Sequence, residues 1–113
     1  MAATPETAVK TQVKKWLKEN AMWSTAISDR YHVGLPDFLC VLRGDYGKIT
    51  GIEVKSATGA LTRRQAEEGR RIIAAGGEYW VAKPNPEGVR KINGRKVPPI
   101  TFTALEVPKG RKP

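Results

Sequence analysis

Residues 37–56 read DFLCVLRGDYGKITGIEVKS, and this stretch predicts a β-hairpin. Asp37 to Arg43 is a nearly continuous apolar run, short enough for a strand that is buried on both faces. Gly44 to Gly47 has the composition of a turn, and Lys48 to Ser56 returns as the second strand. We therefore expect the two strands to pair in antiparallel fashion.

A helix is predicted on each side of this hairpin. Before it, apolar residues recur at helical spacing behind a proline that suits the first helical position, which predicts a helix from about Pro5 to Asn20. After it, Thr62 is followed three residues later by Gln65, the pattern of a capping box. This second helix should run to about Ala75, because two glycines follow.

Further strands are predicted around the hairpin. Residues 26–33 are a possible first strand, and residues 78–83 read as a strand after the second helix. A helix between two strands of one sheet makes a right-handed crossover, so the strand at 78–83 should run parallel to the strand at 48–56. Residues 100–107 are a candidate last edge strand in an otherwise loop-rich end.

Length and composition limit the class of protein. A chain of 113 residues is the usual size of one domain, and it contains no apolar run of the roughly 18 residues that a membrane span needs. The first twelve residues contain no hydrophobic stretch typical of a signal peptide, which predicts a cytoplasmic protein. We expect a single α/β domain with a mixed central sheet flanked by helices. Its core, in the order α-β-β-β-α-β, covers about residues 5–83, and a basic extension rich in proline and glycine covers 84–113.

Charge and rare residues narrow the partners. Twenty Lys and Arg against eleven Asp and Glu give a net charge of +9, which favours nucleic acid, ahead of an acidic membrane, as a partner. A generally basic soluble protein explains the charge equally well. One cysteine and one histidine exclude an internal disulfide and a structural zinc site.

Two carboxylates and a lysine gather on the predicted hairpin. Alternation along a strand places Glu53 and Lys55 on one face, and the hairpin brings Asp37 beside them. Such groups are costly to bury in apolar strands unless they pair with each other or bind a metal. Two carboxylates with room for water suit Mg²⁺ or Mn²⁺, which would polarise a phosphate and activate a water, while Lys55 could orient that water. The alternative interpretation is a structural ion pair.

The arrangement of these residues resembles a known family. Gly34-x-Pro36-Asp37, fifteen intervening residues, Glu53-Val54-Lys55 and then Thr62-x-x-Gln65 resembles the PD-(D/E)XK nucleases, and within them the VRR-NUC branch. The resemblance covers about residues 6–82 and implies a restriction-endonuclease-like core. It also implies a nuclease that depends on Mg²⁺ or Mn²⁺.

The resemblance further implies a set of metal ligands. Asp37, Glu53 and the backbone carbonyl of Val54 would hold the metal. Glu6 matches an acidic residue of the first helix that holds the metal directly or through water. A carboxylate near a helix N-terminus is also favoured by the helix dipole, so Glu6 has a purely structural explanation as well.

Two more residues receive roles from the resemblance. Lys55 matches the catalytic lysine, and Gln65 matches a glutamine that completes the catalytic set with Asp37 and Glu53. The capping box with Thr62 explains Gln65 without any catalytic role.

The function implied by the resemblance is cleavage of branched DNA. A small chain holds one active site, so symmetric cleavage of a four-way junction would require a homodimer. A flap or nicking nuclease, a non-catalytic DNA-binding accessory module and a basic RNA-binding protein are the alternatives. Candidate contacts to nucleic acid are the basic residues and the lone histidine, Lys10, Lys14, His32, Arg63, Arg64, Lys83, Arg90, Lys91, Arg95 and Lys96.

Overall fold

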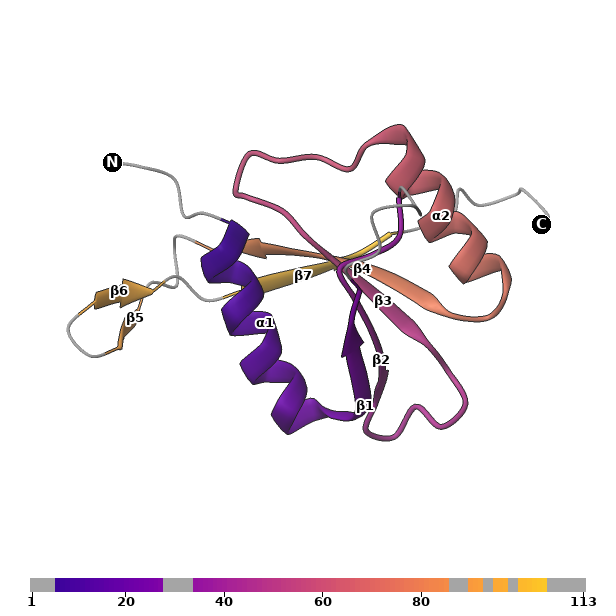
Figure 1. The fold of residues 1–113 in the computed structure, drawn as a ribbon, viewed down its shortest axis with the longest axis horizontal. Helices are drawn as coiled ribbons and strands as arrows, with labels where there is room; N and C mark the ends of the chain where they lie inside the picture. The colour runs from indigo at the N-terminus through magenta and orange to yellow at the C-terminus, as the bar shows by residue number, and fades with distance from the viewer. Residues whose placement is uncertain (1–5, 28–33, 86–89, 93–94, 98–99, 106–113) are drawn as a thin grey trace.

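In the computed structural model of the protein, residues 6–27, 34–85, 90–92, 95–97 and 100–105 are described; for 90–92 and 95–97 this covers the backbone alone. The elements follow one another as shown in Figure 1. They are α1 (Glu6–Asn20), β1 (Ala21–Ala26), β2 (Phe38–Leu42), β3 (Thr50–Val54), α2 (Arg63–Ala74), β4 (Glu78–Pro84), β5 (Arg90–Ile92), β6 (Arg95–Val97) and β7 (Ile100–Ala104).

The main sheet is mixed and has five strands in the order β1-β2-β3-β4-β7. β2 and β3 form the predicted antiparallel hairpin, and β4 runs parallel to β3, as the crossover through α2 requires. β7 pairs with β4 in antiparallel fashion and lies at the edge, as predicted for the last strand. The α/β class and the order α-β-β-β-α-β are thus confirmed, while the small β5–β6 hairpin was not predicted.

The turn between β2 and β3 explains why this hairpin is short and well defined. Gly44 and Gly47 have φ angles of +89° and +77°, the left-handed region that glycine adopts without steric cost. The Asp45 amide donates to the Leu42 carbonyl at 2.9 Å, and the Lys48 amide donates to the Asp45 carbonyl at 3.0 Å. These turn bonds replace the turn-side ends of the predicted strands. β2 and β3 have five residues each, two and four fewer than predicted.

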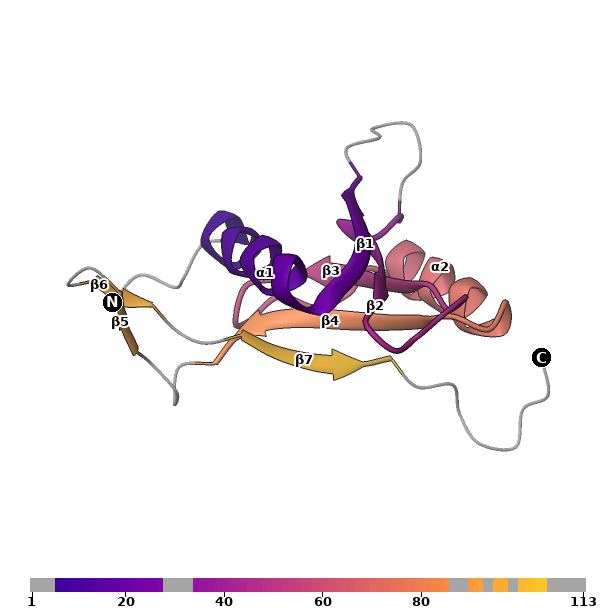
Figure 2. The same cartoon turned by 90° about the horizontal axis from the view of Figure 1, so that it is seen from below.

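Helix α1 covers one face of the sheet. Val9, Val13 and Leu17 recur at helical spacing and belong to one buried cluster with Phe38 and Ile52. At the β4–β7 side, the ring centroid of Trp16 lies 4.7 Å from that of Phe102 and 6.1 Å from that of Trp80. Burying such side chains is worth roughly 1.5–3 kcal/mol each, so this cluster holds the helix on the sheet. Figure 2 shows from below how α1 lies against the sheet.

Helix α2 covers the opposite face and starts as the sequence predicts. Thr62 is its N-cap: the Thr62 hydroxyl accepts from the Gln65 amide at 3.1 Å, and the Gln65 side chain accepts from the Thr62 amide at 3.0 Å. The helix ends at Ala74, followed by Ala75 as C-cap and Gly76 with a φ of +97°. The residues that α2 touches, Gly51 and Tyr79, alternate with those that α1 buries.

Gly69 lets α2 approach the sheet, and replacing it with alanine should destabilise the protein. A Cβ at Gly69 would lie 2.7 Å from Leu105 Cδ2 and 2.9 Å from Tyr79 Cγ, closer than packed atoms come. The overpacking costs about 1–3 kcal/mol and the gain in helix propensity is about 1 kcal/mol, so we expect Gly69→Ala to lower the free energy of unfolding by up to about 2 kcal/mol. Urea denaturation measures it, with the exposed neighbour changed, Arg70→Ala, as control. A raised midpoint for Gly69→Ala would contradict the close approach.

The first strand was predicted in the wrong place. β1 spans Ala21–Ala26 and follows α1 directly, whereas the prediction placed a strand over residues 26–33, of which 28–33 lie outside the described residues. The Asn20 side chain donates to the Trp16 carbonyl at 2.8 Å, and the Asn20 carbonyl accepts from the Arg43 amide at 2.8 Å, so the chain passes from helix to strand without a linker. Five of the six β1 side chains are exposed, so this edge strand carries no apolar alternation to detect. Pro5, predicted to open α1, also lies outside the described residues.

Candidate active site

The predicted acidic residues meet at the open end of the β2–β3 hairpin. Asp37 immediately precedes β2, and Glu53 lies in β3. The register pairs Phe38 with Ile52, so extending it by one residue places Asp37 opposite Glu53. Asp37 Oδ2 accepts a hydrogen bond from the Val54 amide at 2.8 Å. The carboxylate therefore takes the place of a main-chain acceptor where the hairpin opens.

The other oxygen of Asp37 faces a cation from α1. Lys10 Nζ lies 3.3 Å from Asp37 Oδ1, and the two side chains are 41% and 22% exposed. Lys10 was expected to contact nucleic acid, and no partner within the protein was predicted for it. The structure instead places it as the counter-ion of one site carboxylate.

Glu53 is an unusual carboxylic acid, because only 5% of it is exposed. Burial raises the pKa of Glu53 to about 8, with further contributions from a hydrogen bond to Asp37 and from the charge of Asp37. Lys55 lowers this pKa through its positive charge, and Glu6 raises it slightly. At neutral pH Glu53 therefore keeps its proton and contributes no negative charge to the site.

The main-chain carbonyl of Val54 is also left free by the β2–β3 ladder. In an antiparallel pair, one residue directs its N–H and its C=O toward the same neighbouring strand. The Val54 amide points to Asp37, so the Val54 carbonyl faces the same side. Two residues beyond the last paired position, the register brings Pro36 opposite Val54, and proline has no N–H to donate.

These groups fit a hard divalent cation. The carboxyl groups of Asp37 and Glu53 lie next to each other, and the Val54 carbonyl accepts no hydrogen bond from the neighbouring strand β2. Oxygen atoms of these kinds are the ligands that Mg²⁺ and Mn²⁺ prefer. The raised pKa of Glu53 shows that negative charge is unfavourable there without a cation to neutralise it. Over the described residues, no group of three or more His, Cys, Asp or Glu side chains is arranged to hold a metal. Glu6 is exposed and its charge acts on Glu53, and its role as a metal ligand, direct or through water, stays a prediction.

Lys55 and Gln65 differ in how the structure places them. The positive charge of Lys55 lowers the pKa of Glu53, and the Lys55 amide donates to the Ala82 carbonyl at 3.0 Å. The catalytic role of its ammonium group stays a prediction. The side-chain oxygen of Gln65 accepts from the Thr62 amide, so it serves the helix cap. The side-chain oxygen of Gln65 therefore serves as part of the helix cap, and a catalytic role of Gln65 stays a prediction.

Tyr79 was not recognised from the sequence. It is completely buried, and it pairs with Gly51 on the face of the sheet that carries Glu53. Burial and the charges of Glu53 and Asp37 raise the pKa of Tyr79 well above its ordinary value, so the hydroxyl keeps its proton, and it makes no hydrogen bond within the described structure. Alternation along β4 was the available signal, because Tyr79 stands two residues before Val81, the partner of Glu53.

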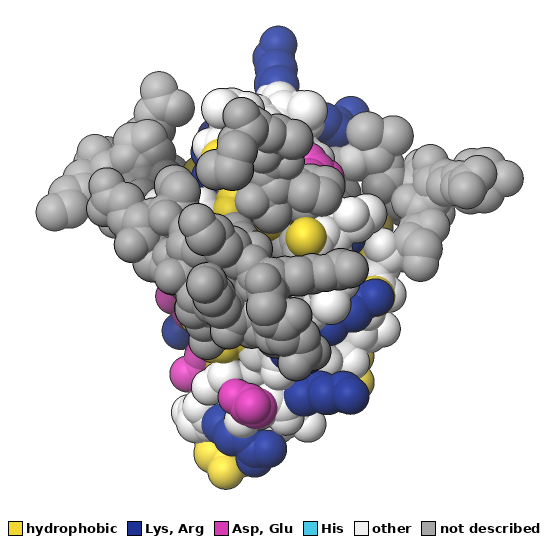
Figure 3. Space-filling model, turned by 90° about the vertical axis from the view of Figure 1, so that its left-hand side faces the viewer, with side chains coloured by type: hydrophobic (Ala, Val, Ile, Leu, Met, Phe, Trp, Pro, Cys, Tyr) yellow, Lys and Arg dark blue, Asp and Glu magenta, His cyan; other side chains and the backbone are white. Residues whose placement is uncertain are grey.

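The remaining basic candidates are spread over the molecule. Arg63 pairs with Glu67 at 3.2 Å, and Arg64 packs so closely on Gly34 that a Cβ there would lie 2.7 Å from Arg64 Cγ. Lys14 is exposed on α1. In Figure 3 the visible Lys and Arg side chains stand at separate points of the face that is shown. His32 lies outside the described residues, as do the side chains of Arg90, Lys91, Arg95 and Lys96.

Comparison with known proteins leaves the family open. No family model and no curated protein matches this chain. Among the described residues, no helix is long and apolar enough to cross a membrane. The functional argument therefore rests on the geometry of the site.

Proposed function

We propose that this protein is a metal-dependent endodeoxyribonuclease with a restriction-endonuclease-like core of the VRR-NUC branch. The observation that carries the proposal is the buried Glu53 next to the half-buried Asp37, with the charge of Lys55 acting on Glu53. The element order, helix, three strands, helix and strand, agrees with the order that the resemblance implies. A structural ion pair accounts for Asp37, which has Lys10 as its partner, but it leaves the buried carboxyl group of Glu53 unexplained.

Different residues of the chain would have different roles in phosphodiester hydrolysis. Asp37, Glu53 and the Val54 carbonyl would hold Mg²⁺ or Mn²⁺, which polarises the scissile phosphate and lowers the pKa of a bound water. The Lys55 ammonium group would orient the attacking water and stabilise the charge that develops on the phosphate. The net charge of +9 would draw DNA toward the site.

The proposed substrate is branched DNA, cut in the cytoplasm by a homodimer. A single acidic site is built by one chain, so paired cuts in the two strands of a four-way junction call for two copies related by a two-fold axis. A flap or a nicked duplex would require only one copy. The substrates in the test below separate these cases.

Cleavage assays with Lys55→Ala test the proposal. Labelled four-way junction, flap and linear duplex are incubated with Mg²⁺, Mn²⁺ or EDTA. We expect metal-dependent paired cuts in the junction and a loss of rate of roughly 10²–10³-fold in Lys55→Ala, because a charge that stabilises the transition state is removed. Lys18→Ala, at the far end of α1, is the charge-matched control and should cut normally.

The contrary outcome is equally clear. If every substrate stays intact with both metals while still shifting on a native gel, the protein is a DNA-binding module and the nuclease proposal is wrong.

A further inference from the structure

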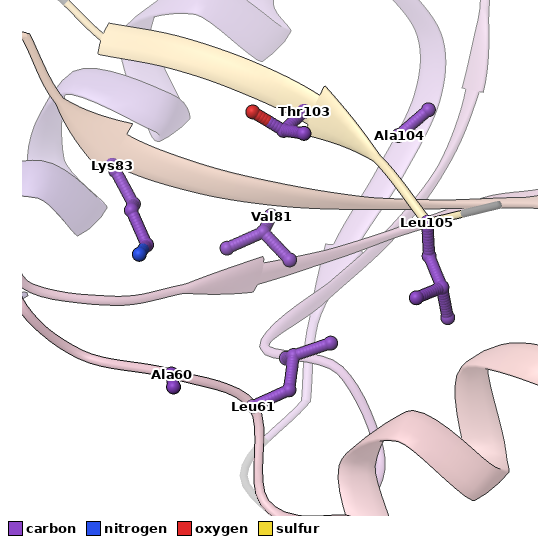
Figure 4. Close-up of a pocket in the computed structure, with 7 residues that line it drawn as sticks. All are labelled: Ala60, Leu61, Val81, Lys83, Thr103, Ala104 and Leu105. Atoms are coloured by element: carbon purple, nitrogen blue, oxygen red, sulfur yellow. The ribbon is translucent and has the colours of Figure 1, made fainter.

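A groove of about 360 Å³ lies over β4 and β7, and one of its lining residues, Val81, is the β4 partner of Glu53. Its floor is formed by Val81 of β4 and Thr103 of β7, and Leu61, from the segment before α2, faces Val81 across it (Figure 4). Leu105 closes the end near α2, where it packs against Gly69, and Lys83 stands at the other end. The groove is thus an apolar slot with a cation at its mouth.

The sheet register ties this groove to the site. Val81 is the β4 residue paired with Glu53, so the two side chains lie next to each other on one face. Lys83 follows two residues later on that face, in the strand beside Lys55. A chain of phosphates that passes Glu53 and Lys55 would therefore run along the Lys83 end of the groove.

We propose that this groove takes one unstacked nucleobase of the DNA strand that is cut, from a nucleotide next to the scissile phosphate. The inference rests on the proposed nuclease function and names a feature of its substrate. The base would lie between Leu61 and Val81, with its polar edge near the Thr103 hydroxyl. Lys83 would contact the phosphate attached to it.

The chemistry of the groove favours a base over other occupants. Its volume is at the lower end for small-molecule sites, which suits one nucleobase and excludes a helix. Its walls are aliphatic, and the faces of a base are apolar in every sequence, so the contact would be sequence-tolerant. The lysine at its mouth complements a phosphate, and an apolar peptide would leave that cation without a partner.

The consequence is a preference for DNA with an unpaired nucleotide. Taking a base out of a duplex costs a few kcal/mol, and the cost is least where the base is already unpaired. Branch points and flaps offer such bases, whereas a linear duplex does not. The groove would then favour branched DNA over a linear duplex, whatever the base sequence.

Thr103→Trp tests the proposal by filling the groove. Thr103 is exposed on an edge strand, where tryptophan is readily accepted, and Thr25→Trp on the opposite edge strand is the matched control. Binding is measured in EDTA, so that no cleavage occurs, on junction and flap DNA with 2-aminopurine at each branch-point nucleotide in turn. Lys83→Met, which keeps the side-chain stem and removes the charge, is the second variant.

We expect 2-aminopurine fluorescence to rise at one branch position with the wild-type protein and with Thr25→Trp. Thr103→Trp should lose that rise and bind branched DNA about tenfold more weakly or worse, with binding of linear duplex unchanged. Lys83→Met should weaken branched-DNA binding and reduce its salt dependence.

The outcomes separate this proposal from the nuclease proposal. Cleavage by the wild type, together with unchanged fluorescence and DNA binding in Thr103→Trp, would show that the groove binds no nucleobase. The nuclease proposal would then be retained. A fluorescence rise that is lost in Thr103→Trp, in a protein that cleaves no substrate, would support nucleobase binding in the groove and contradict the nuclease proposal. If Thr103→Trp changes only the oligomeric state, the groove belongs to an interface between copies of this chain and the nucleobase proposal is wrong.

Discussion

Asp37→Asn should abolish metal-dependent DNA cleavage while the protein stays folded and keeps binding DNA. The asparagine oxygen can still accept from the Val54 amide, so the hairpin end keeps its hydrogen bond. The charge needed to hold a divalent cation is lost, and we expect the rate to fall at least about 10³-fold, or roughly 4 kcal/mol in the barrier. Single-turnover cleavage with Mg²⁺, and binding in EDTA, measure the two effects.

Asp45→Asn provides the matched control for this experiment. It makes the same chemical change in the turn at the far end of the same hairpin. Normal cleavage by Asp45→Asn together with loss in Asp37→Asn would locate the effect at the site. Equal rates for both variants would show that Asp37 has no part in the chemistry.

Stability of the metal-free protein should fall as the pH rises from about 4.5 to about 8, because the folded state raises the pKa of Glu53 to about 8. In this window the unfolded chain has already released the Glu53 proton and the folded protein still holds it. Deprotonation therefore favours unfolding, by on the order of a few kcal/mol in total, and the contribution of Glu53 is constant above pH 8. Urea denaturation at a series of pH values measures the decline.

Glu53→Gln should remove this decline, because the amide stays neutral at every pH. At pH 8 the variant should therefore be more stable than the wild type without metal, and Mg²⁺ should stabilise only the wild type. Glu19→Gln, an exposed glutamate near the end of α1, should keep the wild-type profile. A profile for Glu53→Gln that matches the wild type would mean that Glu53 ionises normally in the folded protein.

The predictable parts of the fold are those with strong local signals. The β2–β3 hairpin and α2 were located correctly because glycines mark the turns and Thr62 and Gln65 form a capping box. The parallel pairing of β4 followed from the handedness of crossovers. At Gly69, α2 comes so close to Tyr79 and Leu105 that there is no room for a side chain.

The features that sequence reasoning missed depend on tertiary contacts. β1 exposes most of its side chains and is held by main-chain pairing to β2, so no apolar periodicity marks it. Lys10 is one of four lysines on α1, and only the approach of the helix to Asp37 distinguishes it from the others. The chemistry of Asp37, Glu53 and Lys55 could be proposed from spacing alone, but the burial that raises the pKa of Glu53 could not.

The ion pair of Lys10 and Asp37 has a consequence for the order in which the protein matures. Where only the metal can neutralise the ligands of a site, the chain folds only when the metal binds, as in zinc fingers. Here one carboxylate has a lysine from α1 and the other keeps its proton, so the acidic residues are neutralised by the chain itself. Under the proposed function, the chain would therefore complete its fold first and bind the divalent cation last, in exchange for a proton and a displaced ammonium group.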